Sequence, residues 1–216
     1  MITVGCAGFP VPATRYFREF LFVEVQETHL GTPGPGTVRR WRREAPEGFQ
    51  FSVLGAKEIG LEGFREGPVI ETALNALSSV AKDLEVDTAV FVVPVDFQCT
   101  KDNKAVVKSF LAGARKYFKT VVFDPGTHWD PDETESLLTG ENTLVSRDPL
   151  NQGLSKKKRA YYRLPGPAGH KSRYEDPVID KLAEIAKAAN HTDVTYVFTN
   201  VDMFADAKRF RKGVKG

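Results

Sequence analysis

The sequence predicts a TIM-type (β/α)8 barrel, and three observations lead to this fold. Eight segments with strand character alternate with helical segments along the 216 residues. Strands that alternate with helices form parallel sheets, and eight such units close into a barrel. The alternative is a doubly wound open sheet, but no G-x-G-x-x-G turn follows any predicted strand.

Each predicted strand is a short apolar segment that ends at glycine, proline or polar residues. The run 88–93 is continuously apolar, which suits a parallel strand covered on both faces. The eight predicted strands are 2–6, 20–26, 49–54, 88–93, 119–123, 143–146, 160–164 and 194–199.

The predicted helices rest on apolar spacing and on residues that begin helices. Pro68 opens the clearest one, 68–84, and Thr37 is predicted to cap 38–43. Residues 55–67 are predicted to form a polar loop. The remaining predicted helices are 14–19, 101–118, 130–138, 176–189 and 201–211.

Two features depart from an ordinary barrel. The sixth unit is reduced, because residues 147–159 leave room for only a turn or two of helix. The chain is also somewhat short, since barrels of this type typically have about 250 residues. No boundary is visible, so residues 1–216 are predicted to form a single domain.

The composition favours a soluble, cytoplasmic protein. The net charge of +2 is too small to indicate nucleic acid or membrane binding by itself. The two cysteines form no disulfide framework, and Cys6 is expected to be a small buried residue. No apolar run reaches the roughly 20 residues that span a bilayer, and the strand pattern at the N-terminus leaves no room for a signal peptide.

Glu24 is the first candidate for a functional residue. In this fold the site is built at the C-terminal ends of the strands. Alternation along residues 22–29 predicts that Glu24 and Gln26 share one side of the second strand. A buried carboxylate must be paired, hydrogen-bonded or neutralised. Glu24 is therefore a general base, a carboxylate that orients a ligand hydroxyl, or the ion-pair partner of Arg163 or Lys57, and the sequence leaves these alternatives open.

Asp124, at the end of the fifth strand, is the candidate for a second catalytic carboxylate. Two carboxylates about 5–9 Å apart across a barrel mouth form the glycosidase arrangement. The alternative is that Asp124 caps the turn at Pro125 and Gly126.

Five further polar residues are predicted to bind a ligand. Three of them have a structural alternative: Arg163 can pair with Glu24, Arg147 with Asp148, and Asn200 with loop backbone. The four histidines show no metal-ligand spacing, so no metal is predicted, and no cofactor is assigned. The predicted ligand-binding residues are Gln26, Lys57, Arg147, Arg163 and Asn200.

Several motifs resemble the YecE-like family, known as domain of unknown function 72. They are a G-C-A-G-F opening at 5–9, V-E-V-Q-E-T at 23–28, T-V-R-R-W at 37–41 followed by P-E-G-F-Q-F-S-V at 46–53, and F-D-P-G at 123–126. The tail is most similar to archaeal members. The resemblance implies a TIM-type barrel and no established activity. The chain departs from the family pattern at Gln26, His29, Leu54, Gly126 and Thr199.

These observations support three hypotheses. The first is a hydrolase acting on a sugar-like or phosphorylated small molecule, with Glu24 and Asp124 as acid and base. The second is a non-catalytic binding or scaffold protein with a degraded site. The third is nucleic-acid binding through 156–159 and 39–43, which the small net charge disfavours. A small polar or anionic ligand is the expected partner, and the oligomeric state is not predicted.

Overall fold

The computed structural model describes residues 1–215, in which eight strands alternate with helices. The strands lie close to their predicted positions. They are β1 (Ile2–Ala7), β2 (Phe22–Val25), β3 (Gln50–Leu54), β4 (Thr88–Val92), β5 (Thr120–Asp124), β6 (Thr143–Val145), β7 (Arg159–Leu164) and β8 (Asp193–Phe198).

The strand order identifies the fold as a TIM-type (β/α)8 barrel. The order is β6-β5-β4-β3-β2-β1-β8-β7, so the strands follow one another in sequence and β8 returns to β1. The β1–β8 pairing is parallel and extends from Ile2 opposite Val194 to Cys6 opposite Phe198. Pairing of the first strand with the last is expected of a barrel and not of a doubly wound sheet. The predicted fold class is therefore confirmed.

Most helices were predicted, but two short ones were missed. The helices are α1 (Ala13–Tyr16), α2 (Glu27–Leu30), α3 (Pro35–Glu44), α4 (Lys57–Leu61), α5 (Pro68–Leu84), α6 (Lys101–Ala114), α7 (Pro131–Leu137), α8 (Pro149–Gln152), α9 (Asp176–Ala188) and α10 (Met203–Lys215). The missed helices α2 and α4 have four and five residues, which is too short for a 3.6-residue apolar period to be recognised. The reduced sixth unit is confirmed, because α8 has only four residues.

The predicted cap at Thr37 is wrong. Helix α3 begins at Pro35, with Gly34 as its N-cap, so Thr37 lies inside the first turn. Proline at the first helical position is favoured because its missing N–H has no partner there in any case.

The second strand also differs from its prediction. All four residues of β2, Phe22 to Val25, are buried, and the chain turns into α2 at Gln26, which is exposed. Glu24 and Gln26 therefore do not share one face of a strand. The strand is covered on both sides, as parallel strands in α/β folds are. Its residues therefore do not alternate between buried and exposed positions.

Residue contacts divide the chain into two compact units. The first comprises 1–24, 46–50 and 147 onward, and the second comprises 25–45 and 51–146. The prediction of one domain is not decided by this division and stays a prediction.

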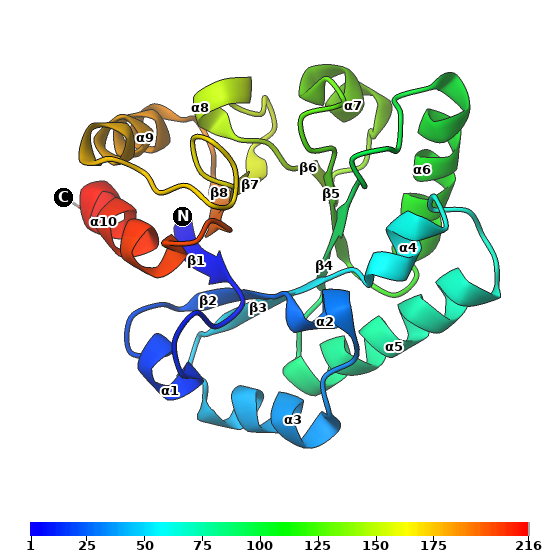
Figure 1. Ribbon diagram of the computed structural model, residues 1–216, viewed down its shortest axis with the longest axis horizontal. Helices are drawn as coiled ribbons and strands as arrows, with labels where there is room; N and C mark the ends of the chain where they lie inside the picture. Colours follow the sequence, from blue (N-terminus) through cyan, green and yellow to red (C-terminus); the bar gives the residue numbers. More distant parts are fainter. Residues whose placement is uncertain (216) are drawn as a thin grey trace. The chain divides into compact units, whose positions relative to one another are not determined.

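Aromatic packing organises the first unit. The ring of Tyr16 contacts Phe9, Phe20 and Phe204, while its buried hydroxyl accepts a hydrogen bond from the Cys6 amide and donates one to the Phe22 carbonyl, each at 2.8 Å. Tyr16 thereby joins β1 to β2. In the same unit, α9 and α10 lie side by side (Figure 1).

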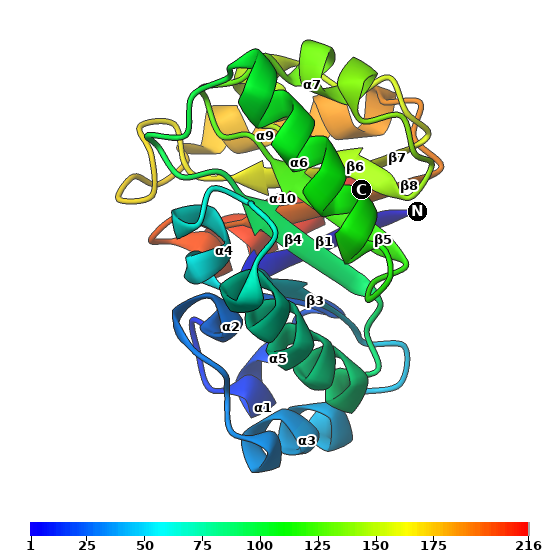
Figure 2. The same cartoon turned by 90° about the vertical axis from the view of Figure 1, so that its right-hand side faces the viewer.

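The second unit has its own aromatic core. Phe91 of β4 packs edge-on against Phe110 of α6 at 4.9 Å between ring centroids, and Phe64 packs against Phe110 and Phe123. Helix α6 accordingly lies along β4 and β5, and α5 lies beside α3 (Figure 2).

Tyr16→Phe is expected to destabilise the fold by about 1–3 kcal/mol, because it leaves a buried N–H and a buried C=O without their partner. Urea unfolding measures the change. Tyr117→Phe is the matched control, because Tyr117 is 37% exposed, and it should change the free energy of unfolding by less than about 0.5 kcal/mol. Equal effects of the two substitutions would contradict this role of Tyr16.

Candidate functional site

Glu24 lies in a buried cluster with Arg163 and Tyr161. Its side chain is fully buried, and that of Arg163 is 11% exposed. Oε1 of Glu24 accepts hydrogen bonds from Nε of Arg163 at 3.2 Å and from Nη2 at 2.9 Å. Oε2 accepts one from the Tyr161 hydroxyl at 2.9 Å. Both carboxylate oxygens are thus engaged by donors from one strand.

Strand geometry explains why Tyr161 and Arg163 reach the same carboxylate. Residues two apart on a strand point to the same face. Glu24 itself is fixed by the backbone, because Ala7 is its register partner on β1 and its carbonyl accepts the Gly8 amide at 2.6 Å. The sequence places the three groups on β2 and β7, and the fold brings these strands together.

This geometry favours the ion-pair alternative for Glu24. A carboxylate that accepts three hydrogen bonds, two of them from a guanidinium, is held in one orientation by its partners. The pairing with Arg163, which the sequence left open, is the one the structure contains. Lys57, the other candidate partner, is exposed at the start of α4.

Asp124 is half-buried at the end of β5 and bonds to its own turn. Its Oδ1 accepts the Gly126 amide at 3.0 Å. Gly126 has φ +60°, a backbone conformation that glycine adopts without strain. The arrangement corresponds to the turn-capping alternative. A catalytic role for Asp124 stays a prediction.

Arg147 and Asp148 are both buried just after β6. The Asp148 carboxylate caps α8, accepting the Leu150 amide at 2.9 Å and the Asn151 side-chain amide at 2.7 Å. Burial raises the pKa of Asp148, although these hydrogen bonds oppose the shift. Arg147 pairs in the backbone with Tyr162 of β7. These contacts make Asp148 part of the connection between β6 and β7.

Asn200 is 1% exposed and holds the loop that follows β7. Its Nδ2 donates to the Ser172 carbonyl at 2.9 Å and to Oδ2 of Asp206 at 2.8 Å. Asp206 in turn accepts the Tyr174 amide at 3.2 Å. Both amide protons of Asn200 are therefore used within the protein, whereas its Oδ1 is buried with no hydrogen-bond partner among residues 1–215. Ligand contact by Asn200 stays a prediction.

Lys57 and His29 line one cavity of about 230 Å³ at the ends of β3 and β4. Its walls are mainly apolar, with Phe64, Phe91 and Pro94 among them. Nδ1 of His29 lies 2.7 Å from the Gly55 carbonyl, so this nitrogen carries the proton. Gln26, by contrast, is exposed and does not line this cavity.

Sequence reasoning gave little weight to the loop between β7 and α9. This segment, 165–175, contains the basic residues His170, Lys171 and Arg173, and all three are exposed. Nδ1 of His170 lies 2.9 Å from the Thr199 carbonyl at the end of β8. The basic residues of this loop could have been recognised from the sequence as a candidate phosphate site, because barrels of this type frequently bind phosphate at the loops after strands seven and eight.

Cys6 shows no sign of nucleophilic activation. Its thiol is buried and lies 3.4 Å from the Met203 carbonyl, and burial raises its pKa to about 12. Reactive cysteines have a lowered pKa.

Within residues 1–215, no group of three or more histidine, cysteine or acidic residues is arranged to hold a metal ion. Across that same part of the chain, no helix is long and apolar enough to cross a membrane.

Comparison with known families identifies the chain. The model of the family described as "Protein of unknown function DUF72" matches residues 13–215. This chain belongs to the DUF72 family. The resemblance predicted from the motifs is thereby confirmed, although its archaeal aspect is not tested. A comparison with curated protein sequences found no match.

Solved structures agree with this membership. A DUF72 protein from Enterococcus faecalis V583 is 19% identical, with a TM-score of 0.77, covering 100% of this chain and 98% of that one. A DUF72 protein from Thermotoga maritima MSB8 is 16% identical, with a TM-score of 0.74 and 100% coverage of both chains. A sugar phosphate isomerase/epimerase from Parabacteroides distasonis is 10% identical, with a TM-score of 0.60, covering 97% of this chain and 94% of that one. Because these sequence identities are low, the structural similarity shows only that this chain shares the fold.

The Glu24–Arg163 pair yields a prediction about stability. Arg163→Met leaves a buried carboxylate with only Tyr161 as its partner and is expected to cost about 3–5 kcal/mol. The double variant Glu24→Leu/Arg163→Met removes both charges and should recover most of that loss. Urea unfolding of the wild type, both single variants and the double variant measures the coupling. Additive losses would mean that the two groups do not interact.

A second prediction concerns Glu27, at the start of α2. Burial raises its pKa, and its Oε2 is buried with no hydrogen-bond partner among residues 1–215. A raised native-state pKa means that stability falls as pH rises through the interval between the unfolded and native pKa values. Glu27→Gln should therefore unfold at a higher urea concentration than wild type at pH 7. At pH 3 the two proteins should match, and a gain that persisted unchanged there would refute the assignment.

Proposed function

We propose that this protein binds a phosphorylated, sugar-like small molecule at the C-terminal ends of β7 and β8. The observation that carries the proposal is the basic loop 165–175, which begins directly after Arg163 and Leu164 and is fixed to the end of β8. The phosphate would contact this loop, with Arg163 as a further cation at the end of β7.

The loop is braced internally, and its exposed cations are Lys171 and Arg173, of which Arg173 has its Nε 3.8 Å from Oε1 of Glu175 in the same loop. Gly166 and Gly169 have φ +100° and +87°, so the chain makes turns that other residues resist. The Tyr174 hydroxyl accepts the Gly166 amide at 2.9 Å, and Oγ of Ser172 accepts the Ala168 amide at 3.0 Å. A loop that is already ordered loses less conformational entropy when it binds an anion.

Glu24 and Tyr161 have a positioning role in this proposal. A guanidinium held by two hydrogen bonds to one carboxylate oxygen is fixed in orientation, and its planar donors suit phosphate. Glu24 would therefore act through Arg163. The contacts of Glu24 and Asp124 support binding better than the hydrolase hypothesis, in which both carboxylates must be available to the substrate.

Two solved structures of similar fold also support this ligand class. One structure of similar fold is a sugar phosphate isomerase/epimerase, and another is phosphoribosyl anthranilate isomerase from Thermotoga maritima, with a TM-score of 0.54. Both names refer to a phosphorylated sugar unit. We extend the ligand class from them to this chain and assign no reaction.

Isothermal titration with ribose 5-phosphate and ribose tests the proposal. The phosphate ester should bind at least about tenfold more tightly than ribose, and its affinity should fall as salt is raised, because exposed cations are screened. Lys171→Ala/Arg173→Ala should weaken binding of the ester about tenfold. Lys181→Ala/Lys187→Ala removes the same charge from exposed positions on α9 and should leave binding unchanged. Equal affinity for ribose and its phosphate, or equal losses in the two double variants, would overturn the proposal.

A further inference from the structure

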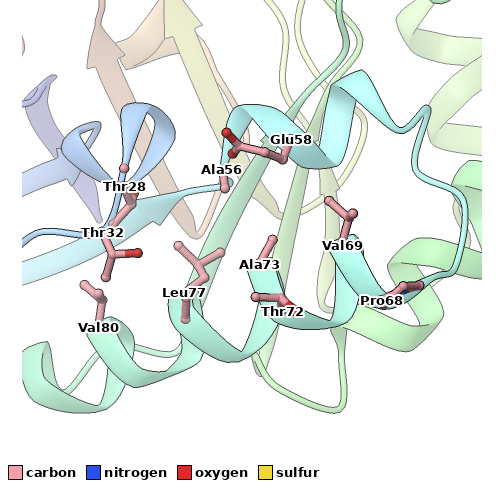
Figure 3. A pocket seen from close by; sticks show the side chains of 12 residues that line it. Thr28, Thr32, Ala56, Glu58, Pro68, Val69, Thr72, Ala73, Leu77 and Val80 are labelled. Carbon is pink, nitrogen blue, oxygen red and sulfur yellow. The ribbon is translucent and has the colours of Figure 1, made fainter.

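A second, larger cavity lies in the unit formed by 25–45 and 51–146. Its volume is about 500 Å³, within the range of about 300–1,000 Å³ that is usual for sites of small organic ligands. It is bounded on one side by α5 and on the other by α2, the residues that follow it, and the start of α4 (Figure 3). None of the residues assigned to the proposed phosphate site lines it.

One face of α5 forms the apolar wall. Val69, Ala73, Leu77 and Val80 recur at helical spacing, and all four line the cavity. Leu77 and Val80 are 3% and 4% exposed, whereas Val69 at the other end is 43% exposed. The small side chain of Ala73 leaves the space between them open. The wall is therefore deep at one end and open to solvent at the other.

The opposite side supplies the polar groups. Figure 3 shows Thr28, Thr32 and Glu58 across the hollow from Ala73 and Leu77. The Thr28 hydroxyl is committed to backbone, since it lies 2.9 Å from the Val25 carbonyl and 2.6 Å from that of Leu54. Its proton is therefore not available to a ligand.

Glu58 is the one charged residue among those that line the cavity. It is half-buried, and nothing in residues 1–215 forms a hydrogen bond or ion pair with its carboxylate. A partly buried carboxylate gains from a cationic partner, and no lysine or arginine contributes to the lining. An anionic ligand would meet repulsion here with no compensating cation.

We propose that this cavity binds a small organic cation, an ammonium group on a short apolar body. The ammonium lies against Glu58, with the threonine hydroxyl oxygens as further acceptors, and the body lies along Ala73 and Leu77. The complementarity rests on one negative charge at the rim of an otherwise apolar hollow. This site is independent of the proposed function, because it takes a ligand of opposite charge and uses different residues.

Three probes with one apolar body and different head groups test this assignment: n-hexylammonium, n-hexanol and n-hexanoate. Binding to the full chain is measured by titration in amide NMR spectra at pH 7. Hexylammonium should bind saturably, about fivefold more tightly than hexanol, which is the upper end for a partly exposed ion pair. Hexanoate should bind more weakly than hexanol. The shifted amides should lie in α5, α2 and α4.

Two variants separate the head group from the apolar wall. Glu58→Gln should reduce the affinity for hexylammonium to that for hexanol and leave hexanol binding unchanged. Glu62→Gln, at an exposed position one turn further on, is the matched control and should keep the wild-type preference. Ala73→Leu fills the hollow and should weaken both probes.

The outcomes are decisive in both directions. Loss of the ammonium preference in Glu58→Gln, with retention in Glu62→Gln, supports the site. Equal binding of the three probes, no saturable binding, or a preference that survives Glu58→Gln would overturn it. The Glu58→Gln result does not depend on whether Ala73→Leu folds, because it is read as a ratio of two probes on one protein.

Discussion

The buried ion pair between Glu24 and Arg163 is the interaction on which the first unit depends. The two residues are 139 positions apart, and Glu24 has no exposed surface. A charge at such a site is tolerated only with a hydrogen-bonded partner, so β2 and β7 must both be placed correctly for either side chain to be stable. Tyr161 completes the arrangement because it shares a strand face with Arg163. The pair therefore specifies how these strands meet, whatever its net contribution to stability.

The other polar residues at the strand ends are also engaged in hydrogen bonds within the protein. Glu24, Asp124, Asp148 and Asn200 all make hydrogen bonds that hold strands, turns or helix ends. Each of these groups thus supports the local structure in which it lies. We propose that the basic loop after β7, fixed to β8 through His170, supplies cations for a phosphorylated ligand.

Much of the fold could be predicted from the sequence, because continuous apolar runs such as 88–93 are typical of strands buried on both faces. The short helices α2 and α4 could not, since four or five residues do not show a helical period. The sequence predicts that Gln26 lies in the second strand, but β2 ends one residue earlier because the short helix α2 follows it directly. The sequence leaves the ion-pair partner of Glu24 open between Arg163 and Lys57, because the choice depends on which strands the fold brings together. The cavity beside α5 could not be predicted from the sequence, because a cavity exists only where neighbouring elements fail to cover a helix face.

We propose that Arg163, positioned by Glu24, belongs to a phosphate-binding site. A crystal structure of the protein with ribose 5-phosphate tests this most directly. The account predicts phosphate density against the loop 165–175, with a guanidinium nitrogen of Arg163 within hydrogen-bond distance and the contacts between Glu24 and Arg163 intact. Density for the phosphate at Lys57 or Asp124, or a Glu24 carboxylate that has left Arg163 to contact the sugar, would contradict it.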